Sequence, residues 1–370
     1  MIAASSGTQA TPSGAGRDSA VVIVTYNSSD VIADCLRSVE RSTGLGAEII
    51  VVDNASRDTT ASLVRSNFPL VRLVENEANR GFAAAANQGV ALATRRLCVL
   101  LNPDTRVSSG AFEALAEAVR RNGDRALAGP RLVNTDGTLQ RSAFRFPTPL
   151  VLLLEQLNFA GRVQWLNPAA RNGRSGCASV DWLKGACLIG PTLLLQQFGP
   201  FDERFFMFSE DVDLCFRVRK AAVPVLYCPS AIVLHHGGMS TRHHARRMTL
   251  AFVDSTYLFY RKHWSYPRLL LASIALTGPA LLKAVVAGAR FFVASMAADR
   301  GEARRQRSLA GTFVSFAAHH PWAPRARRFA RLFRSRQIAG DLSDVASNAS
   351  RGLPGSRRRR RERRAPQRPS

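Results

Sequence analysis

Acidic residues are scarce in this sequence. Only 27 Asp and Glu oppose 51 Lys and Arg, so the 370-residue chain carries a formal net charge of +24. Such a charge favours contact with polyanions, namely nucleic acids, anionic membrane surfaces or phosphorylated substrates. Much of the excess follows residue 240 and ends in the arginine run 357–361, away from the main cluster of acids. The net charge alone does not choose among these partners.

Closely spaced cysteine pairs are also missing. The six cysteines are scattered, and most lie in apolar surroundings such as LCVLL and GACLI. This pattern indicates small core residues in a reducing compartment, and it argues against a disulfide framework or a zinc site. Residues 1–19 lack an apolar segment, which predicts a disordered leader and not a secretory signal. Both features favour a cytoplasmic protein.

No glycine-rich turn follows the first apolar run, which ends in TYNSSD. A dinucleotide-dependent oxidoreductase would carry its fingerprint there, so this class is largely excluded. The arginine-rich tail has no interleaved aromatic residues, and no groove-reading motif precedes it. A nucleic-acid-binding protein therefore stays only a remote alternative.

From residue 20 onward, short β-branched runs alternate with helical patterns. The runs are AVVIVTY, EIIVVDN, VRLVEN and LCVLLNPD, and the helical patterns lie near 29–41, 59–67 and 81–93. Strand and helix repeated in this way predict a mostly parallel, doubly wound α/β sheet of Rossmann-like type. Ligands of such sheets bind at the carboxyl ends of the strands. We therefore expect the polar strand ends TYN, DNAS and NPD to form one site.

The C-terminal region changes character. Residues 269–299 are apolar but contain Pro279, Lys283 and Arg290. The segment is too interrupted for a clear membrane span and too apolar for an exposed helix. This favours a pair of helices at a membrane interface over core helices of a small second domain. The expected organisation is a leader at 1–19, an α/β domain at 20–264, a helical membrane-interface region at 265–340 and a disordered Arg-rich tail at 341–370.

Acids gather in one segment, FDERFFMFSEDVDLCFRVRK, at residues 201–220. Glu210 and Asp211 follow an aromatic run and precede a stretch of helical periodicity, which predicts carboxylates at the start of a helix beside an apolar wall. One interpretation is that they only favour the helix dipole. The other is a general base whose pKa is raised by apolar neighbours and by a second carboxylate.

Six motifs together resemble a known family. They are VVIVTYNSSDVIADCLRSV, IIVVDNASRDTT, NRGFAAAANQGV, LLNPDTRV, the acidic segment and VLHHGGMST, and they extend over about residues 20–262. This ordered set is similar to the inverting family 2 glycosyltransferases with a GT-A fold, and most closely resembles bacterial rhamnosyltransferases of cell-wall and polysaccharide assembly. The resemblance implies a nucleotide-sugar donor, a divalent metal (Mg²⁺ or Mn²⁺), and transfer to a hydroxyl with inversion at the anomeric carbon.

The resemblance assigns a metal site to two positions. Asp104 follows a strand and is a hard-oxygen ligand suited to Mg²⁺ or Mn²⁺. Family members commonly have Asp-x-Asp here, but the first position is Asn102, which suggests looser metal dependence. His235 resembles a further metal or diphosphate contact and matches that position better than His236. The alternative for NPD is a plain turn after a strand.

The nucleotide-sugar is expected to bind at the first two strand ends. Thr25, Tyr26, Asn27 and Asp53 match positions where the family holds the base and ribose. Asp53 is suited to accept the N3 hydrogen of uracil or thymine, and capping the next helix is its alternative role.

The segment NRG is expected to extend the same site. Asn79, Arg80 and Gly81 lead into an Ala-rich helix, where Gly81 permits close backbone approach to a ligand. Arg80 is suited to face a phosphate, with a merely solvated side chain as the alternative.

The reaction itself is assigned to the acidic segment. We expect Asp211 to act as the general base on the acceptor hydroxyl, with Glu210 positioning the acceptor or raising the pKa of Asp211. Asp213 is expected to support the helix start. Trp182 and Gly185 resemble the acceptor-side loop, where Trp182 stacks on a sugar ring or belongs to the core.

The leading hypothesis is a rhamnosyltransferase that moves L-rhamnose from dTDP-rhamnose to a polyprenyl-diphosphate-linked glycan. UDP-galactofuranose, UDP-GlcNAc and other hexose donors are the alternatives within the class. We expect a cytoplasmic protein, peripheral at the inner face of the plasma membrane, with an anionic membrane surface as a partner and no nucleic acid. The sequence leaves the acceptor, the linkage and the oligomeric state open.

Overall fold

The structure of the chain is a computed structural model. It describes residues 14–157, 176–237 and 245–296, together with 301–302, 306–307 and 309–310. The expected tail at 341–370 and most of the expected leader lie outside these residues. The end of that leader is folded, because α1 forms at Gly14–Arg17 and β1 begins at Ser19. Gly16 packs so tightly that an added Cβ would lie 2.4 Å from the Thr43 carbonyl oxygen.

Helices and strands alternate along the first half of the chain, as the periodicity predicts. The helices are α1, α2 (Ile32–Thr43), α3 (Thr60–Asn67), α4 (Phe82–Leu92), α5 (Ala111–Arg121), α6 (Pro149–Gln156), α8 (Thr192–Phe198), α9 (Glu210–Lys220), α10 (Ala245–His263) and α11 (Tyr266–Met296). The strands are β1 (Ser19–Thr25), β2 (Glu48–Asp53), β3 (Arg72–Glu75), β4 (Leu97–Leu101), β5 (Thr105–Val107), β6 (Leu127–Val133), β7 (Leu139–Gln140), β8 (Ala143–Phe144), β9 (Ala178–Ser179), β10 (Trp182–Leu183), β11 (Cys187–Pro191) and β12 (Val225–His235).

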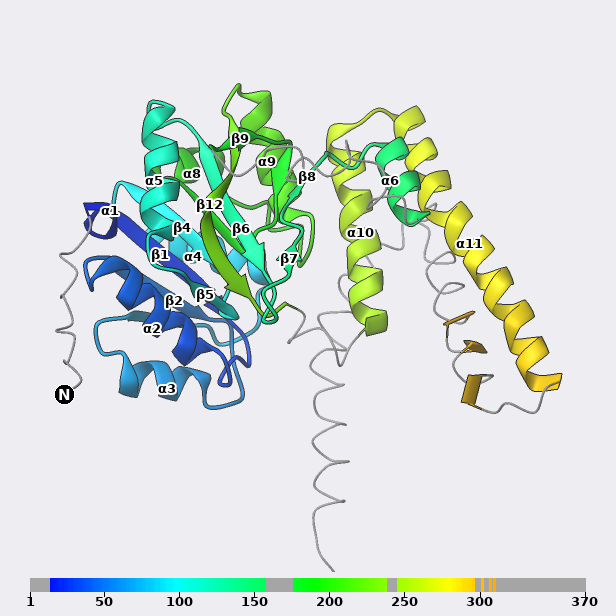
Figure 1. Cartoon of the computed structure of the whole chain (residues 1–370), viewed down its shortest axis with the longest axis horizontal. Helices are drawn as coiled ribbons and strands as arrows, with labels where there is room; N and C mark the ends of the chain where they lie inside the picture. The colour runs from blue at the N-terminus through cyan, green and yellow to red at the C-terminus, as the bar shows by residue number, and fades with distance from the viewer. Residues whose placement is uncertain are drawn as a thin grey trace, which may run out of the picture. The chain divides into compact units, whose positions relative to one another are not determined.

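A central sheet organises the domain (Figure 1). Among the described residues it has ten strands, with the path β3-β2-β1-β4-β11-β6-β12-β5 and with β7 and β9 at its margins. The pairs β1–β2, β1–β4, β2–β3 and β6–β12 are parallel, whereas β11 runs antiparallel to both of its neighbours. The expectation of a mostly parallel α/β sheet is confirmed.

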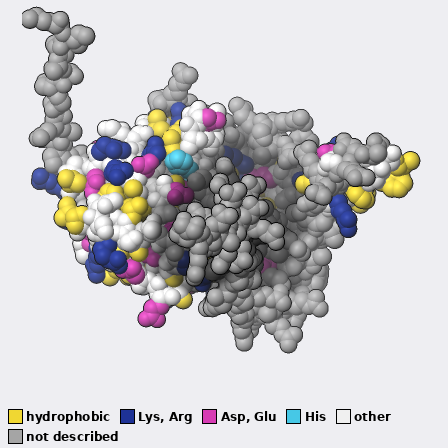
Figure 2. Space-filling model, turned by 90° about the horizontal axis from the view of Figure 1, so that it is seen from below, with side chains coloured by type: hydrophobic (Ala, Val, Ile, Leu, Met, Phe, Trp, Pro, Cys, Tyr) yellow, Lys and Arg dark blue, Asp and Glu magenta, His cyan; other side chains and the backbone are white. Residues whose placement is uncertain are grey.

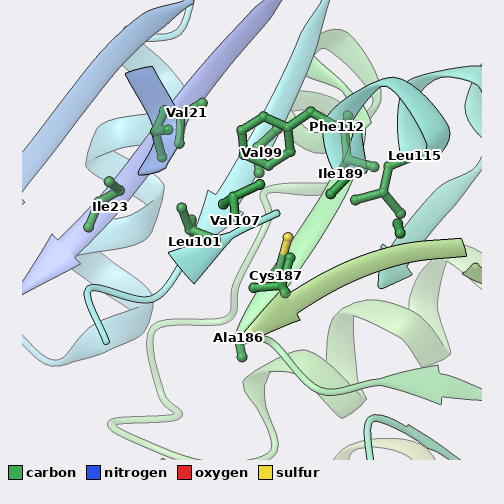
Figure 3. Close-up of a cluster of buried hydrophobic side chains, with 14 of the residues drawn as sticks. Val21, Ile23, Val99, Leu101, Val107, Phe112, Leu115, Ala186, Cys187 and Ile189 are labelled. Carbon is green, nitrogen blue, oxygen red and sulfur yellow. The ribbon is translucent and has the colours of Figure 1, made fainter. Parts of the chain in front are cut away.

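Helices cover both faces of this sheet. On one face α2, α3 and α5 pack against β-branched side chains such as Val21 and Ile23, as Figure 3 shows for the part around Phe112. On the other face α4, α8 and α9 pack against the alternate residues of the same strands. Every residue of β1 is buried, which explains why its sequence is a continuous apolar run.

The register brings the polar strand ends to one edge. Thr25 at the end of β1 pairs with Asp53 at the end of β2. β12 ends at His235, which pairs antiparallel with Thr105 at the start of β5, directly after Asp104. Segments from four strands therefore meet at the carboxyl edge of the sheet.

The interpretation of the cysteines as unpaired core residues is wrong for two of the six. Cys177 is bonded to Cys228, 51 residues further along the chain. β9 pairs antiparallel with β12, Ala178 opposite Tyr227, and the same register brings Cys177 opposite Cys228 with their Cα atoms 4.2 Å apart. Sequence spacing gave no sign of this pairing because only the β9–β12 register creates it. The other four cysteines are free and buried, as small core residues are.

The expected pair of C-terminal helices is a single helix. α11 continues for 31 residues with Pro279 inside it, because a proline removes one backbone hydrogen bond and can be accommodated within a long helix. Ala272 and Ala275 join a buried cluster with residues of α6, α9 and α10. Among the described helices, α11 is the one that has the length and the apolar composition to cross a membrane.

Candidate active site

Asp104 and His235 form the centre of the strand-end site. His235 pairs with Thr105, so its ring lies beside Asp104, the residue before Thr105. His235 Nε2 is 3.4 Å from Asp104 Oδ1. The His236 backbone N–H also donates to the Asp104 carbonyl oxygen at 2.9 Å. Burial alone would raise the pKa of Asp104, but the hydrogen bond and charge of His235 outweigh it and lower that pKa. The structure thus joins the two residues to which the sequence assigned a metal.

The donor set suits a hard divalent cation. A carboxylate oxygen and an imidazole nitrogen are ligands that Mg²⁺ or Mn²⁺ accepts, and neighbouring ligands of an ion with bonds of about 2.1 Å lie about 3 Å apart. The spacing of 3.4 Å between Asp104 and His235 is close to that value. No cluster of three or more His, Cys, Asp or Glu side chains suited to a metal occurs in the described part of the chain. Asn102 stands where the family commonly has the first acid of Asp-x-Asp, and its backbone N–H donates to the Ala186 carbonyl oxygen.

Glu210 and Asp211 begin helix α9, as the sequence predicts. The chain enters this helix through Phe208 and Ser209, whose φ angles of 69° and 62° lie in the left-handed region. Such backbone angles are costly for residues other than glycine and often occur at functional sites. The two carboxyl groups are therefore held by a sharply turned segment.

The two carboxyl groups have different partners. Asp211 accepts hydrogen bonds from the backbone N–H of Gly185 at 2.9 Å and of Val212 at 2.8 Å. Glu210 Oε2 is buried and has no hydrogen-bond partner among the described residues. Burial, and then the nearby charge of Asp211, raises the pKa of Glu210. Burial also raises the pKa of Asp211, although the N–H donors and Lys184 oppose the shift. Carboxyl groups with raised pKa values are suited to take a proton from a hydroxyl.

Gln140 and Lys184 connect these two parts of the site. Lys184 Nζ donates to Gln140 Oε1 at 3.2 Å, and His235 Nδ1 lies 2.6 Å from the same oxygen. Burial lowers the pKa of Lys184, while the charges of Asp211 and Asp104 oppose that shift. The ammonium group therefore interacts with both carboxylates. Gln140 was missed by sequence reasoning, since a glutamine in a two-residue strand has no distinguishing pattern.

Hydrogen bonds connect the carboxyl ends of β1 and β2. Thr25 Oγ1 donates to Asp53 Oδ1 at 2.9 Å, and the Ser56 backbone N–H donates to Asp53 Oδ2 at 3.0 Å. Asp53 is only 3% exposed, and Ser56 Oγ also donates to it. The Asn27 backbone N–H in turn donates to Ser56 Oγ, while Tyr26 is half-buried beside it. Since each carboxylate oxygen accepts about two hydrogen bonds, Oδ2 retains one acceptor position.

Asn54, to which the sequence assigned no role of its own beyond membership of the DNAS strand end, organises the NRG segment. Its Nδ2 donates to Asn79 Oδ1 at 3.0 Å and to the Gly81 carbonyl oxygen at 3.2 Å, and its Oδ1 accepts from the Arg80 backbone N–H. Asn54 is buried, whereas the Arg80 side chain is exposed. The buried asparagine fixes the loop that carries Arg80.

Gly81 is needed for a contact within the protein. It has φ of 83°, and an added Cβ would lie 2.8 Å from Phe206 Cδ2. The Phe82 backbone N–H donates to the Phe206 carbonyl oxygen at 3.2 Å. The close approach expected between Gly81 and a ligand is therefore, in this structure, an approach to the aromatic loop that leads to Glu210.

Trp182 and Gly185 flank the acid pair on β10 and the loop after it. Trp182 stacks on Phe144 with ring centres 4.2 Å apart and donates from Nε1 to the Arg145 carbonyl oxygen. Gly185 lies so close to Asp211 that an added Cβ would be 3.3 Å from the Asp211 Cβ. Gly185 therefore borders the site, and Trp182 is half-buried against the core.

The face of the molecule at the carboxyl ends of β6 and β12 carries side chains of several kinds. Figure 2 views the molecule from the side toward which β6 and β12 point in Figure 1. A histidine side chain lies beside acidic side chains there, and basic and hydrophobic side chains surround them (Figure 2).

The doubly wound sheet, with an Asp–His pair and two carboxyl groups at its carboxyl edge, fits the GT-A glycosyltransferases that the sequence motifs resemble. The family model for glycosyl transferase family 2 matches residues 20–179. The chain is 31% identical over 260 residues to N-acetylglucosaminyl-diphospho-decaprenol L-rhamnosyltransferase of Mycobacterium tuberculosis, covering 65% of this chain and 82% of the relative. The chain belongs to glycosyl transferase family 2 and is a hexosyltransferase close to bacterial rhamnosyltransferases.

Solved structures share the fold at low sequence identity. The mannosyltransferase PcManGT from Pyrobaculum calidifontis, in complex with GDP-Man and Mn²⁺, is 19% identical, with a TM-score of 0.51 over 82% of this chain and 87% of its own. GalNAc-T7 with UDP, GalNAc and Mn²⁺ is 15% identical, with a TM-score of 0.51 over 71% of this chain and 50% of its own. These likenesses support the GT-A architecture.

Proposed function

We propose that the enzyme transfers L-rhamnose from dTDP-rhamnose to a hydroxyl group of a polyprenyl-diphosphate-linked glycan. The observation that carries this proposal is the position of Asp211, held by the Gly185 N–H in a site that also contains the Asp104–His235 pair. The relative from M. tuberculosis is a rhamnosyltransferase whose name specifies a diphospho-decaprenol acceptor, which supports the choice of sugar and of lipid.

Asp211 is the proposed general base. The acceptor oxygen attacks the anomeric carbon and forms the new glycosidic bond, while its proton moves to the Asp211 carboxylate. The bond between the anomeric carbon and the donor phosphate breaks, and its electron pair leaves with the nucleoside diphosphate. Attack opposite to the leaving group inverts the anomeric configuration. Glu210 is proposed to position the acceptor, and the charge of Asp211 helps to keep the pKa of Glu210 high.

Asp104 and His235 are proposed to hold Mg²⁺ or Mn²⁺ at the donor diphosphate. When bound, such an ion neutralises charge that develops on the leaving diphosphate. Lys184 contributes a second positive charge on the same side, since its ammonium group interacts with both Asp104 and Asp211.

The nucleotide base is proposed to bind beside Asp53. Its Oδ2 accepts one hydrogen bond, from the Ser56 N–H, so it retains capacity for an N3 hydrogen of thymine or uracil. The structural neighbours were solved with UDP and with GDP-Man, so the fold is compatible with several bases. UDP-galactofuranose, UDP-GlcNAc or another hexose donor would fit the same contact.

Helix α11 is proposed to bring the enzyme to the inner face of the plasma membrane. Its exposed side chains include Leu282 at 60%, Val285 at 68% and Phe292 at 65% exposure, which is unusual for a soluble surface. Arg261 and Arg268, exposed near its start, suit an anionic lipid surface. A lipid-linked acceptor would be presented at that surface.

Donor binding with Mn²⁺ present, followed by product analysis, tests the proposal. We expect tighter binding of dTDP-rhamnose than of UDP-galactofuranose or UDP-GlcNAc, and rhamnose transfer to polyprenyl-diphosphate-linked GlcNAc. Selective binding of a different sugar nucleotide would reject the rhamnose assignment and keep the enzyme class.

A further inference from the structure

Gln140 lies between the two halves of the site. Its Oε1 is 2.6 Å from His235 Nδ1 and accepts a hydrogen bond from Lys184 Nζ at 3.2 Å. Its Nε2 donates to Asn134 Oδ1 at 2.9 Å and to the His235 carbonyl oxygen at 3.4 Å. All four polar contacts of the amide are thus made within the protein.

The partners of Gln140 fix the orientation of its amide. Lys184 Nζ only donates, so the atom that it contacts must be the carbonyl oxygen. The His235 backbone carbonyl only accepts, so the atom that faces it must be the amide nitrogen. Both partners require the same orientation of the amide. In the opposite orientation the amide nitrogen would face the Lys184 ammonium group, a second donor, and the amide oxygen would face the His235 carbonyl oxygen, a second acceptor.

The orientation of this amide determines where the neutral His235 ring carries its proton. An amide oxygen has no hydrogen to donate, so the contact of 2.6 Å requires a proton on Nδ1. The lone pair of Nε2 then faces Asp104 Oδ1 at 3.4 Å, so the hydrogen bond and charge by which His235 lowers the pKa of Asp104 belong to the ring protonated on both nitrogens and not to this neutral ring. In the neutral ring the two acceptors repel each other. A cation between them would turn this repulsion into attraction.

Gly237 packs closely against the Gln140 amide and the His235 ring. Gly237 has φ of 59°, and an added Cβ would lie 3.2 Å from Gln140 Nε2 and 3.7 Å from His235 Nδ1. The amide, the ring and the glycine therefore pack together, and the amide has little room to turn.

We propose that Gln140 is a positioning residue that holds His235 in the Nδ1–H tautomer, with Nε2 directed at a divalent cation shared with Asp104. The inference rests on the metal-assisted part of the proposed function. Gln140 also accepts a hydrogen bond from Lys184. This bond connects the proposed cation site to Gly185, the residue after Lys184, whose N–H donates to Asp211.

The first measurement is the tautomer of His235 in the metal-free full-length protein. Long-range ¹H–¹⁵N spectra of the histidine rings at a pH of about 8, above the ordinary histidine range, distinguish protonation of Nδ1 from that of Nε2. The signals of His235 are assigned by their loss in His235→Asn. We expect Nδ1–H in the wild type and a shift toward Nε2–H in Gln140→Ala. An Nε2–H ring in the wild type overturns the inference.

The second measurement is Mn²⁺ binding without any sugar nucleotide, by titration calorimetry. Loss of a side chain that orients a metal ligand typically costs about 10- to 100-fold in metal affinity, which we expect for Gln140→Ala. Gln140→Glu keeps an acceptor for His235 Nδ1 and should retain both the tautomer and binding close to that of the wild type. Gln196→Ala is the matched control, because Gln196 bonds the Val90 carbonyl oxygen on α4 instead of a site residue.

The two readouts separate this inference from the proposed function. Unchanged Mn²⁺ affinity and an unchanged Nδ1–H ring in folded Gln140→Ala overturn the role of Gln140 and leave the rhamnosyltransferase proposal intact. Absence of Mn²⁺ binding by the wild type rejects the cation site, and with it this inference, while donor binding and transfer still test the reaction. Weaker Mn²⁺ binding by Gln140→Glu than by Gln140→Ala also contradicts the proposal.

Discussion

Lys262 reaches from helix α10 to the fully buried carboxylate of Asp213 on helix α9. Its Nζ lies 2.7 Å from Asp213 Oδ1 and 2.7 Å from Asp202 Oδ2, so it bridges two acids. His263 Nε2 lies 2.7 Å from Asp213 Oδ1, and Arg217 Nε donates to Oδ2 at 2.7 Å. Lys262 and His263 thus hold the helix that carries Asp211 against α10, the helix that leads into α11.

Removing Lys262 should therefore destabilise the domain. In Lys262→Met, the buried Asp213 loses one of its charged partners, and we expect a loss of about 1–3 kcal/mol in the free energy of unfolding. Asp213→Asn, which leaves Lys262, Arg217 and His263 without their shared carboxylate, should cost more, about 3–5 kcal/mol. Urea denaturation measures both, with the exposed Lys220→Met on α9 as the control. Equal stability of Lys262→Met and Lys220→Met would contradict this account.

Asp211→Asn should abolish turnover and retain donor binding. The amide keeps the shape of the side chain but has no basic oxygen for the acceptor proton, so kcat should fall by about 100- to 10,000-fold. The affinity for the sugar nucleotide, measured by calorimetry, should change little, since the base acts on the acceptor. The exposed turn residue Asp136→Asn provides a control for the loss of one carboxylate. Turnover close to the wild type in folded Asp211→Asn would remove this residue from the mechanism.

The pH dependence of the reaction should report the Glu210–Asp211 pair. Burial raises both pKa values, and the charge of Asp211 raises that of Glu210 further, to about 8, so the base becomes protonated, and kcat/KM falls, at a pH above the ordinary carboxyl range of about 4. Because Glu210 keeps its proton while Asp211 titrates, Glu210→Gln removes no charge from the pair and should leave the falling limb in place. Glu203→Gln, an exposed acid in the loop before α9, is the control for the loss of a carboxyl group. A wild-type limb within the ordinary carboxyl range, or a limb that moves to lower pH in Glu210→Gln, would contradict this explanation.

The contact between Gly81 and Phe206 can be tested with a matched glycine. Gly81 and Gly137 have similar φ angles of 83° and 80°, but only the former would bring a Cβ against a neighbour. Gly81 also has ψ of 163°, a backbone region almost confined to glycine, so Gly81→Ala should cost at least about 1–3 kcal/mol more than Gly137→Ala through backbone strain and overpacking. Thermal unfolding compares the two. We also expect lower turnover in Gly81→Ala, because Phe206 belongs to the loop that leads to Glu210.

Membrane association through α11 should depend on its exposed apolar side chains. Combined substitution of Leu282, Val285 and Phe292 by Gln should lower co-flotation with anionic vesicles, since these side chains are mostly exposed and available to lipid. Deleting the whole helix is a poorer test, because Ala272 and Ala275 belong to the buried cluster. Leu70→Gln, at an equally exposed site outside α11, serves as the control. Undiminished flotation of the folded triple variant would place the membrane contact elsewhere.

Local patterns in the sequence determined the sheet, its helices and the strand-end residues. The burial of β1 on both faces requires an unbroken apolar run, and the break of periodicity after Phe208 marks the start of α9. Strand ends at Thr25, Asp53 and Asp104 follow from the alternation of strand and helix, because parallel strands bring these ends to one edge. These features depend on residues that are neighbours in the chain.

Only the tertiary structure decided which distant residues meet. Gln140 contacts the His235 ring across 95 positions, and Cys177 bonds Cys228 across 51, each through the register of a two-residue strand. Such short strands have too few residues for a periodic signal, so their pairing is set by the rest of the sheet. The single helix α11 likewise continues through Pro279, where local preference alone predicted a break. The sequence determined the acids, the histidine and the strands that carry them, while strand register and packing determined the hydrogen bonds that orient them.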